Sequence, residues 1–366
     1  MSIRSRNRKR SLLFVATLAA LVLAACSSSD GGSGASASTA ADACTPADTP
    51  VITLAAYSNP YDAYGKLTSS SGSFSLDWKD AHDQSLIFQM SFGGSSTQAE
   101  NIVNGFPADV YASSTATDVE LVQDAGLITH DWKSDPDGSI VATSVVGFMV
   151  RPGNPKNIHT WSDLTQPGLQ ILTPDPAQSG GARWNIVAAY GAAMRGQVDG
   201  YAKDSSTDAE KLLEGIFSNV TVLDKSANDS FKNFESGNGD VAITYENQAL
   251  AGIAGGSEDE FVIPPSTVLI QTPTVVVDKN AEAHCNTDVV DAFVKYLHSP
   301  DAQEIFQTVG YQRPIDIADA KKGDGDQYPA IGDLFTTDDL GGWDALVGDT
   351  VFGPDGVFTQ AQAAVS

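Results

Sequence analysis

The sequence predicts an α/β fold with mostly parallel sheets. Short apolar runs of strand length alternate along the chain with helical patterns of 10–15 residues, and this alternation is typical of α/β proteins. The chain has 366 residues, of which 42% are hydrophobic and 18% are charged. That composition is ordinary for a globular protein, and the length suggests about two domains.

Eight strands are expected, and helices begin directly after several of them. The strand at 51–58 leads into a helix that opens at Asn59-Pro60, with proline at the first helical position. The other strands are expected at 86–94, 108–114, 144–150, 169–174, 219–224, 240–245 and 268–277. Clear helical patterns follow at 96–106, 117–127, 287–299 and 300–310.

Two apolar stretches, SVVGFMV (144–150) and QTPTVVV (271–277), are candidates for chain crossings between two lobes. That arrangement gives a discontinuous lobe 1 (46–145 and 271–366) that encloses an inserted lobe 2 (146–270). Two domains in tandem are the alternative. The resemblance described below favours the discontinuous version.

The N-terminus predicts export. A basic head is followed by the apolar run LLFVATLAALVLAA, which is too short for a membrane span of about 20 residues. It ends in Leu23-Ala24-Ala25-Cys26, so residues 1–25 are expected to be a signal peptide. Cys26 resembles the lipidated cysteine of bacterial lipoproteins, and the Ser/Gly/Ala-rich segment 26–45 then forms a flexible tether. An ordinary signal peptide with a chance cysteine is the alternative.

Charge and cysteine usage narrow the possible partners. Residues 1–25 carry five basic side chains and no acidic one, so the chain without them has a formal net charge of −30 rather than −25. Such an acidic surface argues against nucleic acid and anionic membrane surfaces as partners.

An exported protein can form disulfides. Cys44 and Cys285 are therefore a possible pair, although the sequence does not show whether their Cα atoms lie within bonding range.

Four expected strand-to-helix junctions are small, polar and uncharged. Each follows a strand, where open α/β sheets place their ligands, and a helix N-terminus offers free N–H groups to an anion. Glycine allows close approach to that backbone. By itself, this pattern indicates only a possible binding site for small anions, because serine is also a common N-cap. The junctions are Ser58-Asn59-Pro60, Gly93-Gly94-Ser95-Ser96, Ser179-Gly180-Gly181 and Ser226-Ala227-Asn228.

One long stretch of the sequence indicates a specific protein family. Residues 150–194, which include SGGARWN, closely resemble the bacterial sulfate-binding proteins of ABC importers, as do GDVAITYENQAL (239–250) and the segment 289–314. The likeness runs from about residue 51 to 345 and includes FGGSSTQAENIVNGFPADV (92–110). The resemblance implies a type II periplasmic-binding fold, in which two α/β lobes joined by a two-segment hinge bury a dehydrated sulfate in the cleft.

The resemblance also implies a set of seven ligand-binding residues, none of which contributes a charged group. Aspartate stands at the first position and an indole at the last in the best-known members, whereas this chain has an amide and a phenol there. Arg183 is implied to lie behind the site and to bond the loop that presents the donors; an exposed helix arginine is the alternative. The seven residues are Asn59, Ser95, Ser179, Gly180, Gly181, Ala227 and Tyr245.

Sulfate carries only acceptor oxygens, so a site made wholly of donors satisfies it, whereas hydrogen phosphate needs an acceptor for its proton. Asp175 and Asp229 are the acids close enough in sequence to spoil this discrimination, and both are expected to be solvated. Thiosulfate, selenate, chromate and molybdate are not ranked by the sequence. A monomeric receptor that delivers sulfate to an ABC permease is expected, with no cofactor and no metal.

Two other classes compete with the receptor: an exported hydrolase and an adhesive lipoprotein. The chain has no HExxH or GxSxG motif, and Ser179 has no identifiable base among the five histidines. No cluster has zinc or calcium spacing. The histidines are His82, His130, His159, His284 and His298.

Overall fold

The computed structural model describes residues 44–325 and 327–365. The expected signal peptide, Cys26 and nearly all of the tether lie outside these residues. All eight expected strands are present, although β3 is shorter and β4 longer than expected, and two short strands, β8 and β10, are additional. The strands are β1 (Val51–Tyr57), β2 (Ile87–Gly93), β3 (Val110–Ala112), β4 (Ile140–Val150), β5 (Ile171–Pro174), β6 (Val220–Asp224), β7 (Val241–Tyr245), β8 (Glu260–Val262), β9 (Ser266–Val276) and β10 (Asp333–Phe335).

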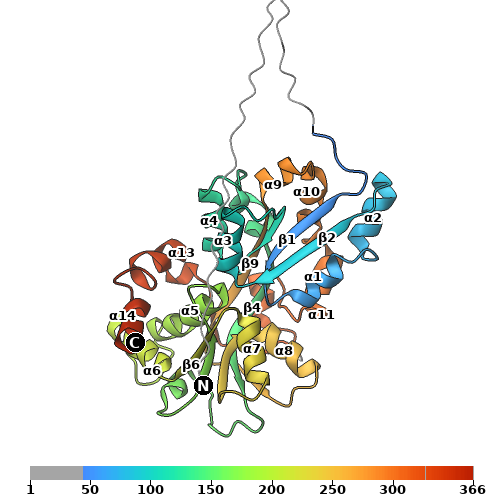
Figure 1. The fold of residues 1–366 in the computed structure, drawn as a ribbon. Coiled ribbons are helices and arrows are strands. Elements are labelled where there is room, and N and C mark those ends of the chain that lie inside the picture. Colours follow the sequence, from blue (N-terminus) through green and yellow to red (C-terminus); the bar gives the residue numbers. More distant parts are fainter. Residues whose placement is uncertain (1–43, 326, 366) are drawn as a thin grey trace, which may run out of the picture. The chain divides into compact units, whose positions relative to one another are not determined.

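The helices cover both sides of these strands (Figure 1). Pro60 is the N-cap of the first helix rather than its first residue. The helices are α1 (Tyr61–Leu67), α2 (Ser73–His82), α3 (Ser95–Val103), α4 (Ala116–Asp124), α5 (Gly180–Met194), α6 (Ser206–Phe217), α7 (Ala227–Glu235), α8 (Glu246–Ala254), α9 (Asp278–Ala283), α10 (Thr287–Tyr296), α11 (Pro300–Thr308), α12 (Ile317–Lys322), α13 (Gly342–Ala345) and α14 (Val357–Val365). Short 3₁₀ or π turns lie at Trp132–Ser134, Pro136–Ser139, Trp161–Thr165, Asp338–Leu340 and Leu346–Thr350.

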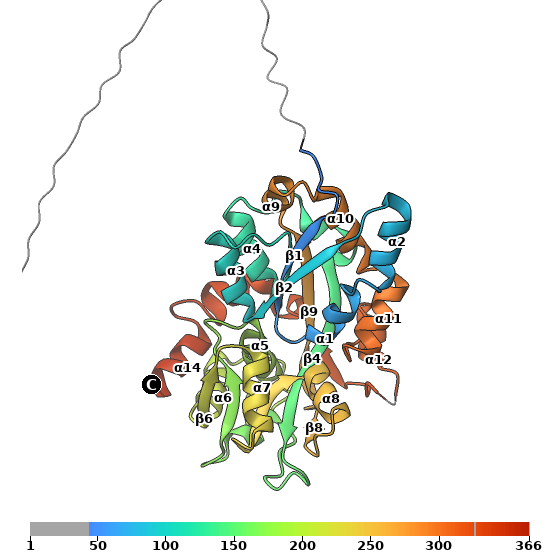
Figure 2. The ribbon, with the colours of Figure 1, turned by 45° about the vertical axis from the view of Figure 1, so that its right-hand side comes forward.

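The strands form one hydrogen-bonded path in the order β2-β1-β3-β9-β4-β7-β5-β6, with β10 beside β9 and β8 beside β4. At one end, β1, β2 and β3 pair in parallel; we call them the first strand group. At the other end, β5, β6 and β7 also pair in parallel and form the second strand group. The long antiparallel pair β4 and β9 passes between the two groups (Figures 1 and 2).

Each strand group has its own buried apolar residues. Ile52, Leu54 and Val110 of the first group pack with Phe293 and Phe306 from helices α10 and α11. The second group packs against α5 and α6 through a separate cluster. Of the five buried apolar clusters among the described residues, these two are the largest, and each lies against one strand group.

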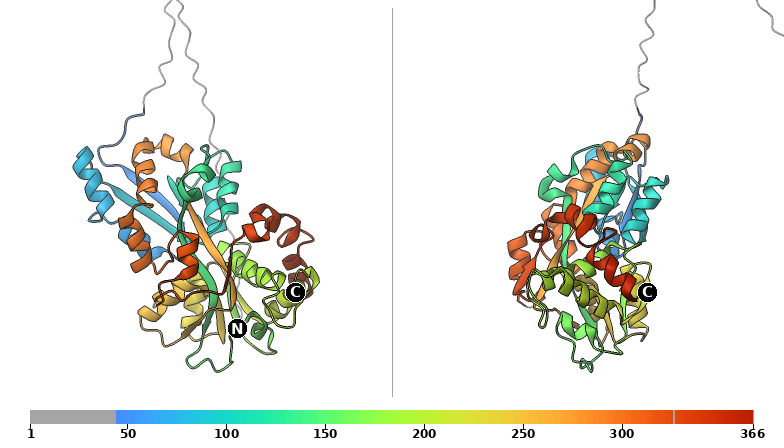
Figure 3. Two further views of the ribbon diagram at one scale, coloured as in Figure 1. Left: turned by 180° about the vertical axis from the view of Figure 1, so that it is seen from behind. Right: turned by 90° about the vertical axis from the view of Figure 1, so that its left-hand side faces the viewer.

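The C-terminal residues pack differently from the expectation. The sequence assigns residues 271–366 to lobe 1, but Phe335, Leu346 and Phe358 join the core formed by α5 and α6. Figure 3 shows α13 and α14 beside these helices in the view from behind. The apolar face of α6 is covered by α14, and this long-range contact leaves no periodic signal in the sequence.

Cys44 and Cys285 form a disulfide with a Cα–Cα distance of 5.4 Å. The bond ties the start of the described chain to the turn between α9 and α10, 241 residues later. Within residues 44–325 and 327–365, no helix is both long and apolar enough to cross a bilayer.

Candidate functional site

The carboxyl ends of six strands meet at one place. Because strands within each group run parallel, their last residues lie at the same edge of that group. The loops after β1, β2 and β3 face those after β5 and β6 and the last residue of β7. Together they line a small pocket, here called the central pocket, with about 170 Å³ of empty space.

Six of the seven residues expected at the site line the central pocket, and Gly180 is the exception. The lining contains no carboxylate, lysine, arginine or histidine within the described chain. The full lining is Tyr57, Ser58, Asn59, Gly93, Ser95, Ser114, Ser179, Gly181, Ala227 and Tyr245.

Several hydrogen-bond donors at the pocket have no acceptor among the described residues. Gly181 and Ala227 lie in the first turns of α5 and α7, where backbone N–H groups have no partner four residues earlier. The N–H of Asn59 is also free of an internal acceptor. In addition, Nδ2 of Asn59 is buried and unpaired, while its Oδ1 accepts a hydrogen bond from Ser58. Buried donors of this kind need an acceptor from elsewhere.

The structure assigns different roles to the two expected serines. Ser179 is the N-cap of α5, yet its hydroxyl makes no capping bond, so it remains free at the pocket. The backbone N–H of Ser179, which the resemblance implies is a donor to the ligand, instead donates to the carbonyl of Asp175 at 2.9 Å. Ser95 Oγ accepts the N–H of Ser114 at 3.0 Å. The Tyr111 hydroxyl donates to the Ser95 carbonyl at 2.9 Å, which fixes the serine from a second side.

Tyr245 ends β7 and is 1% exposed. Its hydroxyl lies 2.8 Å from the hydroxyl of Ser114, which follows β3 in the other strand group. Burial raises the pKa of Tyr245 well above its usual value of 10, although the hydrogen bond to Ser114 partly opposes this shift. The phenol is therefore protonated at neutral pH and remains a hydrogen-bond donor.

Gly180 contacts the opposite side of the site rather than the pocket. A Cβ atom at this position would lie 2.9 Å from Cβ of Ser114 and 3.0 Å from Cγ2 of Thr115. At Gly94, a Cβ atom would lie 2.7 Å from the carbonyl oxygen of Lys225. Both glycines stand where backbone from one strand group touches the other, so close contact requires them. The sequence predicts only the exposure of N–H groups at Gly180.

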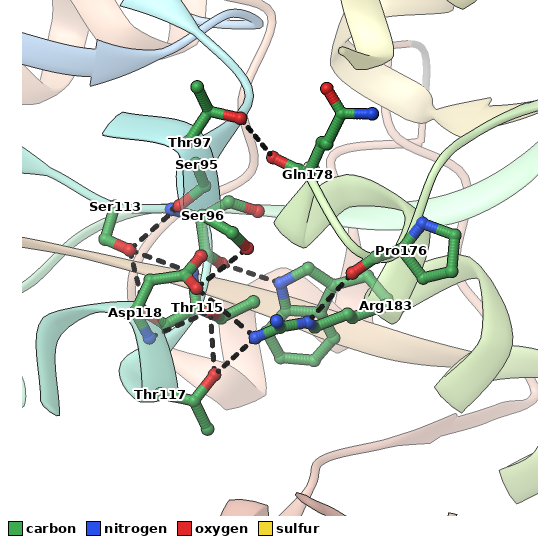
Figure 4. Close-up of polar contacts among 12 residues, drawn as sticks. Ser95, Ser96, Thr97, Ser113, Thr115, Thr117, Asp118, Pro176, Gln178 and Arg183 are labelled. Carbon is green, nitrogen blue, oxygen red and sulfur yellow. Dashed lines mark hydrogen bonds and ion pairs between the residues drawn. The ribbon is translucent and has the colours of Figure 1, made fainter. Parts of the chain in front are cut away.

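Arg183 lies beside the pocket and joins helices from the two strand groups (Figure 4). Its Nε donates to the carbonyl of Pro176 at 3.2 Å, in the loop that leads to α5. Its Nη1 lies 3.2 Å from both Thr117 Oγ1 and Asp118 Oδ1 of α4. Asp118 also accepts from Ser96 at 2.9 Å. The arginine therefore holds the donor loop and also contacts the opposite side.

These residues line a second, more open hollow, which we call the rim groove. Unlike the central pocket, the rim groove is rich in charge. Its polar lining is Ser96, Glu100, Thr117, Asp118, Glu120, Asp124, Asp175, Arg183, Thr359 and Gln362, and apolar residues of α4, of the loop before α5 and of the C-terminal segment complete it.

The two acids that could spoil a neutral site do not line the central pocket. Asp175 accepts from the N–H of Ala177 at 2.9 Å and from Nε2 of Gln178 at 2.7 Å. Asp229 accepts from the Ser226 hydroxyl at 2.8 Å at the start of α7. Both carboxylates therefore serve the loops around the pocket.

A separate cavity contains a His–Asp pair but lacks the geometry of a hydrolase site. His130 Nδ1 lies 2.8 Å from Asp278, and Ser139 lines the same cavity. The Ser139 hydroxyl, however, donates to the carbonyl of Trp132 at 2.9 Å and to Asp135 at 3.1 Å. No hydrogen bond to His130 would activate it as a nucleophile. The described residues also contain no group of three or more His, Cys, Asp or Glu side chains placed to hold a metal.

Ser114 lines the site although the sequence alone does not single it out. It ends the expected strand 108–114, and the residues Ser113-Ser114-Thr115 are small, polar and uncharged like the four junctions described above. The local signal is therefore present. What the sequence lacks is the pairing that places β3 beside β1 and aligns their carboxyl ends.

Comparison with known proteins agrees with this architecture. The family model for bacterial extracellular solute-binding proteins matches residues 79–312. The chain belongs to this family. A sulfate-binding protein of Salmonella typhimurium is 41% identical over 288 residues, which cover 77% of this chain and 83% of the relative. A thiosulfate-binding protein of Escherichia coli is 35% identical over 278 residues, covering 74% and 80%.

Among solved structures, the sulfate-binding protein SubI from Mycobacterium tuberculosis H37Rv superposes on this solute-binding protein with a TM-score of 0.70. The sequences are 31% identical, and the match covers 81% of this chain and 98% of the relative. The expected α/β type II periplasmic-binding fold is thereby confirmed. Four of the strand pairs are antiparallel, since the crossing strands β4 and β9 run against each other and against β3, β7 and β8. β10 pairs with β9 in parallel.

Proposed function

We propose that this solute-binding protein is an extracytoplasmic receptor that binds sulfate in the central pocket and delivers it to an ABC permease for import. The observation that carries the proposal is a small pocket lined only by uncharged groups, in which buried donors lack acceptors. A sulfate-binding relative at 41% identity supports the same ligand.

The chemistry of the lining favours sulfate over hydrogen phosphate. Sulfate is a dianion with acceptor oxygens only, so N–H and O–H donors can satisfy it without a compensating charge. Hydrogen phosphate brings a proton that needs an acceptor, and an unpaired buried donor costs about 1–3 kcal/mol. Because no carboxylate lines the pocket, that proton has no strong acceptor.

Closure of two lobes is the proposed mechanism, with β4 and β9 as the hinge. The donors of Asn59 and Ser95 come from one strand group, whereas those of Ser179, Gly181 and Ala227 come from the other. Sulfate bridges both sets only when the groups meet, so it shifts the equilibrium towards the closed form. Contacts across the closed site support this mechanism, for example the Thr97 N–H to the Gln178 carbonyl at 3.3 Å.

Export and anchoring complete the proposal. Removal of residues 1–25 leaves Cys26 as a lipidated first residue, and the segment 26–45 tethers a monomeric receptor to the outer face of the cell membrane. The receptor has no catalytic activity of its own. The thiosulfate-binding relative makes thiosulfate the principal alternative ligand.

Calorimetric titration of the chain without residues 1–26 tests the ligand. We expect sulfate to bind with a micromolar or tighter Kd and phosphate to bind roughly 5- to 150-fold more weakly. Thiosulfate and molybdate titrations under the same conditions test the alternatives. Heat from phosphate equal to that from sulfate, or no heat from sulfate, would contradict the proposal.

A further inference from the structure

Ser114 reaches the central pocket from the one strand end that the expected ligand set does not use. It follows β3 and is 1% exposed, and its side chain lines the pocket together with Tyr245. Its backbone is held from two sides. The N–H donates to Ser95 Oγ at 3.0 Å, and the carbonyl accepts from Trp184 Nε1 at 2.7 Å.

This double attachment places the hydroxyl accurately. Ser95 begins α3 directly after β2 of the first strand group, whereas Trp184 lies on α5, next to the second group. Ser114 is therefore clamped when the two groups meet. Its Oγ then lies 2.8 Å from Tyr245 Oη, and either oxygen can be the donor in that hydrogen bond.

The two hydroxyls together carry two hydrogens, and their mutual bond uses one. Within the described chain, neither oxygen has another hydrogen-bond partner. One hydrogen is therefore left over, and it belongs to a buried group at the pocket wall. If Tyr245 donates to Ser114, the free hydrogen is on the serine; in the reverse case it is on the tyrosine.

We propose that Ser114 is a further ligand-binding residue, which forms with Tyr245 a hydroxyl pair that donates one hydrogen bond to the bound oxyanion from whichever oxygen is free. The inference rests on the proposed function, since it concerns the same pocket. The pair occupies the position at which the resemblance implies an indole N–H donor. Either of its two hydroxyl groups can donate that hydrogen bond.

Interchangeable donors make a distinctive prediction for a double-mutant cycle. In Tyr245→Phe the serine hydrogen is no longer shared and turns to the ligand, and in Ser114→Ala the tyrosine hydrogen does so. Each single variant should therefore bind sulfate within about 3-fold of the unmodified protein. The double variant loses both hydrogens and should bind roughly 10- to 100-fold more weakly, as expected for a lost hydrogen bond to a charged group.

Matched controls separate this effect from general damage. Tyr64 and Thr274 form a similarly buried hydroxyl pair, 2.7 Å apart, that does not line the pocket. Ser75 is a buried serine on α2 whose hydroxyl has no partner. Tyr64→Phe and Ser75→Ala, singly and together, should leave the sulfate Kd unchanged. A thermal melt of each variant confirms that it is folded.

Calorimetry with sulfate as the probe gives separable outcomes. A strongly non-additive loss in the double variant supports the hydroxyl pair. If Tyr245→Phe alone loses as much affinity as the double variant, Tyr245 is the sole donor and the pair is refuted while the sulfate receptor stands. If the double variant binds normally, neither hydroxyl touches the ligand. Absence of sulfate binding by the unmodified protein overturns both proposals.

Discussion

The central pocket and the rim groove lie side by side but are built from opposite kinds of side chain. The pocket is lined by amide, hydroxyl and apolar groups, whereas the groove contains five acids and Arg183. Asp118 and Arg183 in the groove pair with each other, and the three other acidic residues on α3 and α4 face the open groove. The comparison indicates that charged side chains are absent from the central pocket but line the groove beside it.

The difference follows from what each region must do. Fixed dipoles at short range stabilise a dianion in a dry pocket without trapping it as a strong ion pair would, and they need no change of protonation. Between the strand groups, the ion pair of Arg183 and Asp118 joins α5 to α4. Exposed acids further out are screened beyond roughly 10 Å at ordinary salt, so a net charge of −30 in the chain without residues 1–25 does not prevent anion binding.

Placing a carboxylate in the pocket should have the largest effect. Ser179→Asp puts a negative charge where the free hydroxyl lies, and charge repulsion at an effective dielectric of about 20 amounts to about 4 kcal/mol per charge pair at 4 Å. We expect sulfate affinity to fall at least roughly 1,000-fold. Ser179→Asn, which is similar in size and neutral, should lose far less. Equal losses in both variants would show that the size of the side chain, and not its charge, determines sulfate affinity at this position.

Blocking contact between the strand groups should rank second. Gly180→Ala adds a Cβ atom that collides with Ser114. An overpacked contact typically costs about 1–3 kcal/mol, so a roughly 10- to 100-fold weaker Kd is expected. Gly65 on α1 is the control, since a Cβ atom there meets nothing within 4 Å. Small-angle scattering should show that sulfate compacts Gly65→Ala but compacts Gly180→Ala less; an unaffected Gly180→Ala would count against the contact.

Neutralising the rim ion pair should have a smaller effect. Asp118→Asn keeps the shape of the side chain and its bond from Ser96 but removes the charge that Arg183 contacts. Because Arg183 is partly exposed, we expect only about a 3- to 10-fold weaker sulfate Kd. Glu120→Gln, on the same helix and also in the groove, is the control and should change the Kd less than about 2-fold. A larger effect at Glu120 would mean that the groove acts through its overall charge.

A change of pH should have the smallest effect. Burial raises the pKa of Tyr245 and Tyr111 well above 10 and that of Tyr57 to about 12. A raised phenol pKa means that the proton is retained below that value, so every hydroxyl donor stays protonated from pH 6 to 9. Sulfate affinity should be flat across this range in calorimetry. A titration midpoint inside it would reveal an ionisable group at the ligand.

Much of the candidate site is predictable because its residues follow strands. The motif SGGARWN and the junctions after the apolar runs mark Asn59, Ser95, Ser179 and Gly181 from the sequence alone. At Gly180 the sequence accounts for exposed N–H groups, but the steric contact with Ser114, 66 residues earlier in the chain, leaves no local signal. Ser114 escapes prediction for the same reason. The sequence shows its residue type and its position after a strand, but not the residues that it contacts.

By itself, the sequence determined the alternation of strands and helices, the absence of charge at four strand-to-helix junctions and the likeness to one family of receptors. These properties are local, because each depends on residues that are close together in the chain. Only the tertiary structure decided that α14 covers α6, that Arg183 meets Asp118 and that Ser114 meets Tyr245. Each of these contacts joins segments that are distant in the chain. The last two form because strand pairing brings the ends of several strands to one edge.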